Sequence, residues 1–374
     1  MKLLKIFKKF LFTLFVIFFT TAATFAGDLR SNPKQSKCDY LFSGVVVRGD
    51  AQKIVSQIPS WSSGSTLCLD SPGGSLTEGI KMFHAIWENG SLATRVLQGA
   101  ECQSACALAF LGGSLVVGTG VIRSKNAVIE AGATLGFHSP RLVLPRDGIH
   151  SSADVAGAYQ IALIDAHAMF DLTQTQEQSA RGMSEFLFSK ILMTPPQDMY
   201  RINTIGRASL SDVQVANVPI KELSWDALMN VCNTAFLKAD STEKTWLNEK
   251  LSFESFSDNG IDGSGDIILK NDRVWSWSDD WFMNFMIRGY PASHVNESFC
   301  KIRLSKLAYN RERNLPIADR DPTTHYFEIS IWVDAYVPTG SGFADYAVSY
   351  KKGYERVYLP WVSLWHPDKP LSDF

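Results

Sequence analysis

The sequence predicts an α/β protein with a parallel sheet, followed by a β-rich α+β unit. Between residues 44 and 97, short apolar segments alternate with amphipathic segments of helix length, the pattern of parallel strands joined by right-handed crossovers. From about Ser224 onward tryptophans crowd the sequence, and one long segment alternates apolar and polar residues. The chain has 374 residues, of which 45% are hydrophobic, so it is long enough to build two cores.

Residues 1–26 predict a signal peptide. A lysine-rich start precedes an apolar run from Phe10 to Thr20, and Thr24-Phe25-Ala26 has the small-x-small form of a signal-peptidase site. We therefore expect export to the periplasm and a mature chain that begins at Gly27; an uncleaved leader would instead anchor the protein in the membrane. Removing the leader lysines changes the formal net charge from −2 to about −6, which argues against a nucleic-acid partner.

The first predicted elements follow in order along the mature chain. Gly44–Val47 is predicted to be a short buried strand, residues 51–58 a helix, and Thr66–Leu69 a second strand. In Ser75-Leu76-Thr77-Glu78 we predict a capping box, in which the Ser75 hydroxyl accepts the N–H of Glu78 and the Glu78 carboxylate accepts the N–H of Ser75. The helix that starts there ends at Asn89-Gly90, and Leu92–Leu97 is the third strand.

Three short motifs carry the chemistry. Asp70-Ser71-Pro72-Gly73-Gly74-Ser75 must turn sharply and leave backbone N–H groups bare. Ser104, in Cys102-Gln103-Ser104-Ala105-Cys106, stands at the start of a short apolar helix, where the N–H groups of Gly74 and Ala105 could hold an oxyanion. His138 follows the apolar Leu135-Gly136-Phe137 and supplies a base. The alternatives without a catalytic role are a helix cap for Ser104 and a buried, hydrogen-bonded core histidine for His138.

The order and spacing of these motifs resemble the proteolytic subunit of the Clp protease, in the wider ClpP/crotonase superfamily, over roughly residues 40–220. The resemblance implies a spiral of ββα units, with Ser104 as nucleophile and His138 as base. It implies Asp198 as the third member of the triad, because Asp198 stands two residues before an aromatic, as the family's aspartate does; Asp165 and Asp171 compete for this role. A serine/lysine dyad with Lys125 is a further alternative.

The family resemblance also concerns the surroundings of the site. It implies that residues 151–172 form a protruding helix, which in the family packs in ring assemblies, so a homo-oligomer is an implied partner. The stretch Gly118 to Ala133 is longer than the family's connection and could reshape the mouth of the site. The leader and the additional unit look more like periplasmic ClpP-like proteins of unassigned function than like the cytosolic protease. The implied domains are 27–225 and 226–374.

All six cysteines lie after the leader, in the part of the chain that we expect to be exported. Disulfides persist in the oxidising compartment that such a chain enters. Cys102 and Cys106 are four residues apart, a helical spacing that permits either a bridge beside Ser104 or two small core side chains. We expect Cys232 to pair with Cys300 and to tie the tryptophan-rich unit. No cysteine or histidine cluster has zinc spacing, so no metal or other cofactor is expected.

Two functions fit these observations. The first is an exported serine peptidase or related acyl hydrolase, in which Gly73 and Ser75 help to bind an extended peptide along the Gly-Gly edge. The second is a binding or assembly protein with a silent site, whose function lies in the C-terminal unit. A crotonase-type enzyme acting on acyl-CoA would leave Ser104 and His138 unexplained.

Overall fold

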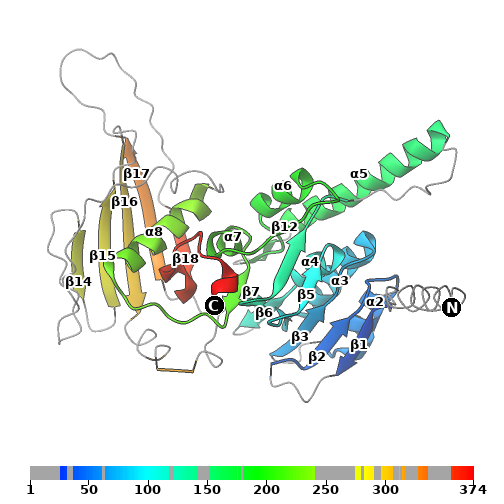
Figure 1. Ribbon diagram of the computed structural model, residues 1–374, viewed down its shortest axis with the longest axis horizontal. Coiled ribbons are helices and arrows are strands. Elements are labelled where there is room, and N and C mark those ends of the chain that lie inside the picture. Colours follow the sequence, from blue (N-terminus) through cyan, green and yellow to red (C-terminus); the bar gives the residue numbers. More distant parts are fainter. Residues whose placement is uncertain are drawn as a thin grey trace, which may run out of the picture.

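The computed structural model describes residues 26–31, 37–60, 64–117, 122–140, 151–174, 176–177, 180–240, 274–278, 282–289, 296–305, 311, 314–316, 327–335 and 355–374. Residues 1–25 of the predicted signal peptide lie outside these ranges. Figure 1 shows two sheet-containing regions with helices between them and one long helix that projects from the molecule. In the described part no helix is both long and apolar enough to cross a membrane.

The main sheet has six strands, in the order β1-β2-β3-β4-β8-β13. Strands β2 through β13 run parallel to their neighbours, whereas β1 pairs antiparallel with β2 at one edge. The strands are β1 (Asp28–Ser31), β2 (Tyr40–Ser43), β3 (Ser65–Asp70), β4 (Leu92–Val96), β8 (Ala127–Glu130) and β13 (Gln214–Ala216). The predicted α/β class with parallel strands is therefore confirmed.

Smaller sheets complete this region. A second, three-stranded sheet has the order β12-β9-β5, and Ser104 and His138 directly follow two of its strands. Its strands are β5 (Glu101–Gln103), β9 (Thr134–Phe137) and β12 (Tyr200–Arg201). The stretch that we expected to be an insertion contributes β8 to the main sheet and β7 (Ile122–Lys125) to a hairpin. The two remaining strand pairs are β6 (Ser114–Val117) with β7 (Ile122–Lys125), and β10 (Gln176–Glu177) with β11 (Ala180–Arg181).

The helices of this region begin and end largely where their capping residues predict. Helix α3 starts after Ser75, whose hydroxyl accepts the N–H of Glu78, and ends at Gly90, which has a φ of 87°. Helices α2 and α3 pack together, as do α3 and α4, and the core they share contains fully buried Phe83 and Phe110. The helices are α2 (Asp50–Gln57), α3 (Leu76–Asn89), α4 (Ala105–Phe110), α5 (Ser152–Gln174), α6 (Glu185–Met193) and α7 (Ile205–Leu210).

Two local predictions were wrong. The Glu78 carboxylate does not return to Ser75: the Ser75 N–H donates to Val46 O at 2.9 Å, and Glu78 Oε1 instead accepts the N–H groups of Gly49 and Ala51. Glu78 therefore ties the first turn of α3 to the start of α2. The first strand is also displaced, because β2 ends at Ser43 and Gly44 turns the chain with a φ of 95°.

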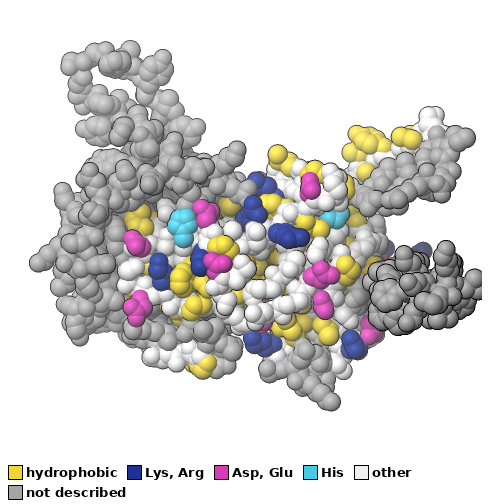
Figure 2. Space-filling model, viewed as in Figure 1, with side chains coloured by type: hydrophobic (Ala, Val, Ile, Leu, Met, Phe, Trp, Pro, Cys, Tyr) yellow, Lys and Arg dark blue, Asp and Glu magenta, His cyan; other side chains and the backbone are white. Residues whose placement is uncertain are grey.

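Helix α5 projects from the body of the molecule, as predicted for residues 151–172 (Figure 1). Its surface is unusually apolar for an exposed helix, and several large side chains on it are about half exposed or more (Figure 2). These side chains are Val155, Tyr159, Ile161, Leu163 and Ile164, with Phe170 slightly less exposed. Single exposed apolar residues are ordinary, but a run of them on one element is not.

The C-terminal region contains helix α8 and an antiparallel five-stranded sheet in the order β14-β15-β16-β17-β18. The predicted alternating strand is β17. The elements are α8 (Trp225–Asp240), β14 (Val274–Ser278), β15 (Phe282–Gly289), β16 (Asn296–Ser305), β17 (Phe327–Ala335), β18 (Glu355–Leu359), and the 3₁₀ turns η2 (Trp361–Leu364) and η3 (Leu371–Asp373). The chain then returns to α7, where Leu371 N–H donates to Asn203 O at 2.9 Å.

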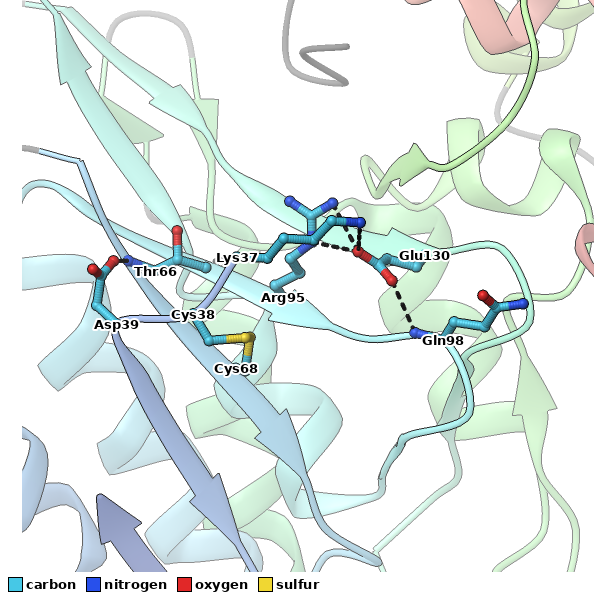
Figure 3. Close-up of a disulfide and its surroundings, with 8 residues drawn as sticks. All are labelled: Lys37, Cys38, Asp39, Thr66, Cys68, Arg95, Gln98 and Glu130. Carbon is cyan, nitrogen blue, oxygen red and sulfur yellow. Dashed lines mark hydrogen bonds and ion pairs between the residues drawn. A yellow bond between two sulfur atoms is a disulfide. The ribbon is translucent and has the colours of Figure 1, made fainter. Parts of the chain in front are cut away.

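A disulfide and a buried charge cluster lie close together on the main sheet, with Cys68 in β3, Arg95 in β4 and Glu130 in β8 (Figure 3). Cys38 and Cys68 are bonded, with their Cα atoms 5.6 Å apart. Glu130 is buried and accepts Lys37 Nζ at 2.9 Å, Arg95 Nε at 3.0 Å and Gln98 N–H at 3.1 Å. Burial alone would raise the pKa of Glu130, but the Gln98 N–H and the two cations outweigh it and lower that pKa.

Candidate active site

Ser104 occupies the turn between β5 and α4 in a backbone conformation that side chains rarely adopt. Its φ is 54° and its ψ is −120°, one of three non-glycine residues with positive φ in the described part of the chain. The Ser104 N–H donates to Gly136 O at 2.9 Å, which fixes the turn against β9. A serine on a strained strand-to-helix turn is the arrangement that exposes a nucleophilic hydroxyl.

Gly73 lies directly against this turn. Its φ is 97°, and a Cβ added to it would stand 2.5 Å from Gln103 O and 2.8 Å from Ser104 Cβ. Upstream, the Ser71 N–H donates to Glu101 O at 2.6 Å and Ser71 O accepts the Gln103 N–H at 3.1 Å. Glycine is therefore required at position 73, because any side chain would push the strand carrying Ser104 away.

Two backbone N–H groups near Ser104 have no hydrogen-bond partner in the described part of the chain. Gly74 has a φ of 150° and packs against Val46, and among the described residues no hydrogen bond uses its N–H. Ala105 is the first residue of α4, so its N–H lies outside the helical hydrogen-bond ladder. These are the two donors that we predicted for an oxyanion, and both remain available for one.

The predicted motifs meet at a cavity of about 410 Å³. The polar residues that line it are Gly74, Ser75, Thr77, Ser104, His138, Ser139 and Asp165. Its apolar walls come from Leu76, Leu108, Phe137, Pro140, Ile161, Ala162 and Ile191. Ser104 and His138 therefore face one space, although 34 residues separate them in the sequence.

His138 follows β9 and is partly buried. Its Nδ1 lies 2.7 Å from Ser139 O, and since a carbonyl only accepts, this contact places the ring proton on Nδ1. The other ring nitrogen, Nε2, is then the acceptor in the neutral imidazole. Within the described part no hydrogen bond joins the His138 ring to the Ser104 hydroxyl. The Ser139 N–H donates to Thr194 O at 2.9 Å, which holds the end of β9 against the loop after α6.

The structure places the three candidate acids differently. Asp198 is exposed, lies in a turn closed by its N–H on Pro195 O, and does not line the cavity. Asp171 is exposed and lies 3.7 Å from His167. Asp165 lines the cavity and accepts a hydrogen bond from Thr77 Oγ1 at 3.3 Å. The assignment of Asp198 as the acid stays a prediction.

Cys102 and Cys106 form a disulfide on either side of Ser104, with their Cα atoms 5.2 Å apart. The bridge links β5 to the first turn of α4 and so braces the strained turn, as one of the two interpretations of the sequence predicted. Cys232 is also disulfide-bonded. The side chain of Cys300 lies outside the described part, so its pairing with Cys232 stays a prediction.

Lys125 is not part of the cavity. Its Nζ donates to Leu111 O at the end of α4 and to Gly182 O, away from Ser104. Burial lowers the pKa of Lys125 to about 7, while the charge of Asp212 acts in the opposite direction. Since no lysine lines the cavity, the geometry gives no support to a serine/lysine dyad.

Among the described residues, no group of three His, Cys, Asp or Glu side chains could hold a metal ion. No protein-family model matches the chain, and no curated protein matches it at a significant level. The function must therefore be argued from the geometry of the site.

Proposed function

We propose that the protein is an exported serine hydrolase that forms an acyl-enzyme on Ser104. The observation that carries this proposal is the positive φ of Ser104 at a cavity that His138 and Gly74 also line, with the first-turn N–H of Ala105 next to Ser104 in the chain. An ordinary helix cap needs neither a strained backbone nor a disulfide across the turn, and the Ser104 turn has both. Ser104 makes no capping hydrogen bond with its side chain, so the cap alternative does not explain the residue.

The proposed reaction has two halves, acylation of Ser104 and hydrolysis of the acyl-enzyme, and His138 transfers a proton in both. The Ser104 hydroxyl attacks a carbonyl carbon while His138 Nε2 accepts its proton, and the N–H groups of Gly74 and Ala105 stabilise the oxyanion. Collapse of the intermediate breaks the bond to the leaving group, and His138 donates to that group the proton that it took from Ser104. Water then attacks the acyl-enzyme, with His138 again as base, and releases the acid and free Ser104.

Peptides are the proposed substrate class. Gly74 and Ser75 line the cavity, and among the described residues the Gly74 N–H has no partner, so the backbone of an extended peptide can pair with it there. The apolar walls formed by Leu76, Leu108 and Phe137 suit an uncharged side chain next to the reacting carbonyl.

A fluorophosphonate probe tests the proposal directly. We expect the purified mature protein to be labelled at Ser104, and Ser104→Ala or His138→Ala to abolish labelling. Ser139→Ala is the matched control, because Ser139 lines the same cavity but its structural contacts are made by its backbone N–H and carbonyl. Labelling that persists in Ser104→Ala, or its absence from the wild-type protein, would favour a binding or assembly protein with a silent site.

A further inference from the structure

Gly27, the residue at which we expect the mature chain to begin, is buried. Ala26 forms an isolated parallel bridge with Val45 beside the main sheet, and the chain enters β1 at Asp28. A Cβ added to Gly27 would stand 2.5 Å from Asp50 Oδ2 and 2.5 Å from the Phe42 ring. Glycine is therefore the residue that fits this position. First residues of mature chains usually lie exposed at the surface, so this enclosure needs an explanation.

The group facing Gly27 is a fully buried carboxylate. Asp50 is the first residue of α2 and has no exposed surface. Its Oδ2 accepts the Val47 N–H at 2.8 Å and its Oδ1 accepts Lys53 Nζ at 2.7 Å. Lys53 Nζ also donates to Gly27 O at 2.7 Å, so the lysine joins the start of the mature chain to α2. Because a Cβ on Gly27 would stand 2.5 Å from Asp50 Oδ2 and would be one covalent bond from Cα, Gly27 Cα lies within about 4 Å of Asp50 Oδ2.

From this geometry we propose that cleavage after Ala26 creates an internal ion pair between the new α-ammonium group of Gly27 and the carboxylate of Asp50. Hydrolysis of the Ala26–Gly27 peptide bond consumes one water and leaves a carboxylate on Ala26 and an ammonium on Gly27. A released ammonium can rotate about the N–Cα bond and offers three donors, whereas the uncleaved peptide offers one N–H. The buried carboxylate then has a second cation beside Lys53. The proposal rests on the expected cleavage and is independent of the hydrolase.

The ion pair would hold more than the N-terminus. Val47, which donates to Asp50, follows Val46, and Val46 holds the Gly-Gly turn on both sides. The Val46 N–H donates to Gly73 O at 2.8 Å, and Val46 O accepts the Ser75 N–H at 2.9 Å. Maturation would thus fix the segment against which the Gly73–Ser75 turn packs.

The test compares two proteins that differ by one residue. The first starts at Gly27 and the second at Ala26, both released from a fusion that leaves a native N-terminus, and each is also made with Asp50→Asn. We expect the Ala26 form to melt about 4 °C or more below the Gly27 form, and this difference to disappear in the Asp50→Asn background. Asp28→Asn, which changes an exposed carboxylate next to Gly27, is the matched control and should leave the difference intact.

Two further measurements keep the test decisive if Asp50→Asn does not fold. Lys53→Gln removes the other cation at Asp50, so it should enlarge the difference between the two starts. Acetylation of the Gly27 amine should reproduce the loss seen in the Ala26 form. Equal melting temperatures for the two starts, a difference that survives Asp50→Asn, or an exported protein whose intact mass begins at a residue other than Gly27 would overturn the proposal.

Discussion

The disulfides Cys38–Cys68 and Cys102–Cys106 are the same bond used in two different settings. Cys38–Cys68 spans a sequence separation of 30 and lies beside the Glu130 cluster, where the described charges are paired. Cys102–Cys106 spans a separation of four and encloses a residue with strained backbone next to unpartnered N–H groups. A long loop loses much entropy in the unfolded chain when it is closed, whereas a short one loses less. The first bond therefore serves stability, and the second serves local geometry.

The surroundings of the two disulfides differ in how well their polar groups are paired. Around Glu130 each oxygen accepts at least one hydrogen bond, so the cluster satisfies the rules for buried charge. Around Ser104 the local structure is less favourable, because a non-glycine residue has positive φ and two backbone N–H groups have no partner among the described residues. Departures from good local chemistry that are held in place by the fold are typical of functional sites.

Removing the long-range disulfide should give the largest effect on stability. Replacing Cys38 and Cys68 together by Ala should lower the free energy of unfolding by about 3.5 kcal/mol, from loop-closure entropy alone. Labelling of Ser104 in the folded protein should be unchanged, because the bond does not touch the cavity. Urea unfolding and probe kinetics measure the two quantities. A large loss of labelling in the folded variant would contradict the division between the two regions.

Breaking the charge cluster should cost somewhat less and should depend on pH. The pKa of Glu130 is lower in the folded than in the unfolded chain, so its contribution is complete above about pH 4.5 and disappears as the pH falls further. Glu130→Gln should therefore lower stability by about 2 to 3 kcal/mol at pH 7 and flatten the loss of stability in acid. Urea unfolding at several pH values measures this. Exposed Glu185→Gln is the control and should change stability by less than about 0.5 kcal/mol.

Removing the short disulfide should affect stability less and labelling of Ser104 more than removing the long-range one. Replacing Cys102 and Cys106 together by Ala should lower the free energy of unfolding by about 2 kcal/mol, because the closed loop is short. The rate of Ser104 labelling should nevertheless fall, since the strained turn loses its brace. Unchanged labelling would show that Gly73 and the hydrogen bond from Ser104 to Gly136 are sufficient to hold the turn.

The smallest expected effect concerns Asp198. With His138 Nδ1 on the Ser139 carbonyl and Asp198 exposed, Asp198→Asn should slow labelling less than about tenfold. Asp165→Asn, which changes the wall of the cavity, should instead raise the KM for the proposed peptide substrates. A loss of about a thousandfold in Asp198→Asn would show that Asp198 orients His138 during the reaction, as the family resemblance implies.

The parts that the sequence predicted depend on local chemistry. Ser75 and Gly90 bound α3 because a cap and a stop act through their own neighbours, and Cys102 and Cys106 are close for the same reason. The convergence of Ser104 and His138 on one cavity also agrees with the prediction from the motifs. A contact can be predicted from the sequence when one short segment already contains both partners.

The missed features depend on partners far away in the sequence. Glu78 could have completed a capping box, but Val46 O takes the Ser75 N–H and the carboxylate finds the start of α2 instead. The Cys38–Cys68 pair follows from the alignment of β2 beside β3, which the spacing of the cysteines does not encode. Asp165 is one of the three candidate acids in the sequence, but its place at the cavity depends on the packing of α5 against α3, which no motif around it encodes.

The positions of the two described bridges also determine how the protein should be made. Both lie within the first quarter or so of the chain, in the region that builds the site. In a reducing cytoplasm the same polypeptide would lack both cross-links, so its site-bearing region would have to fold without them. Recombinant protein for any of these measurements should therefore be produced in an oxidising compartment or refolded under oxidising conditions, and assayed without reductant.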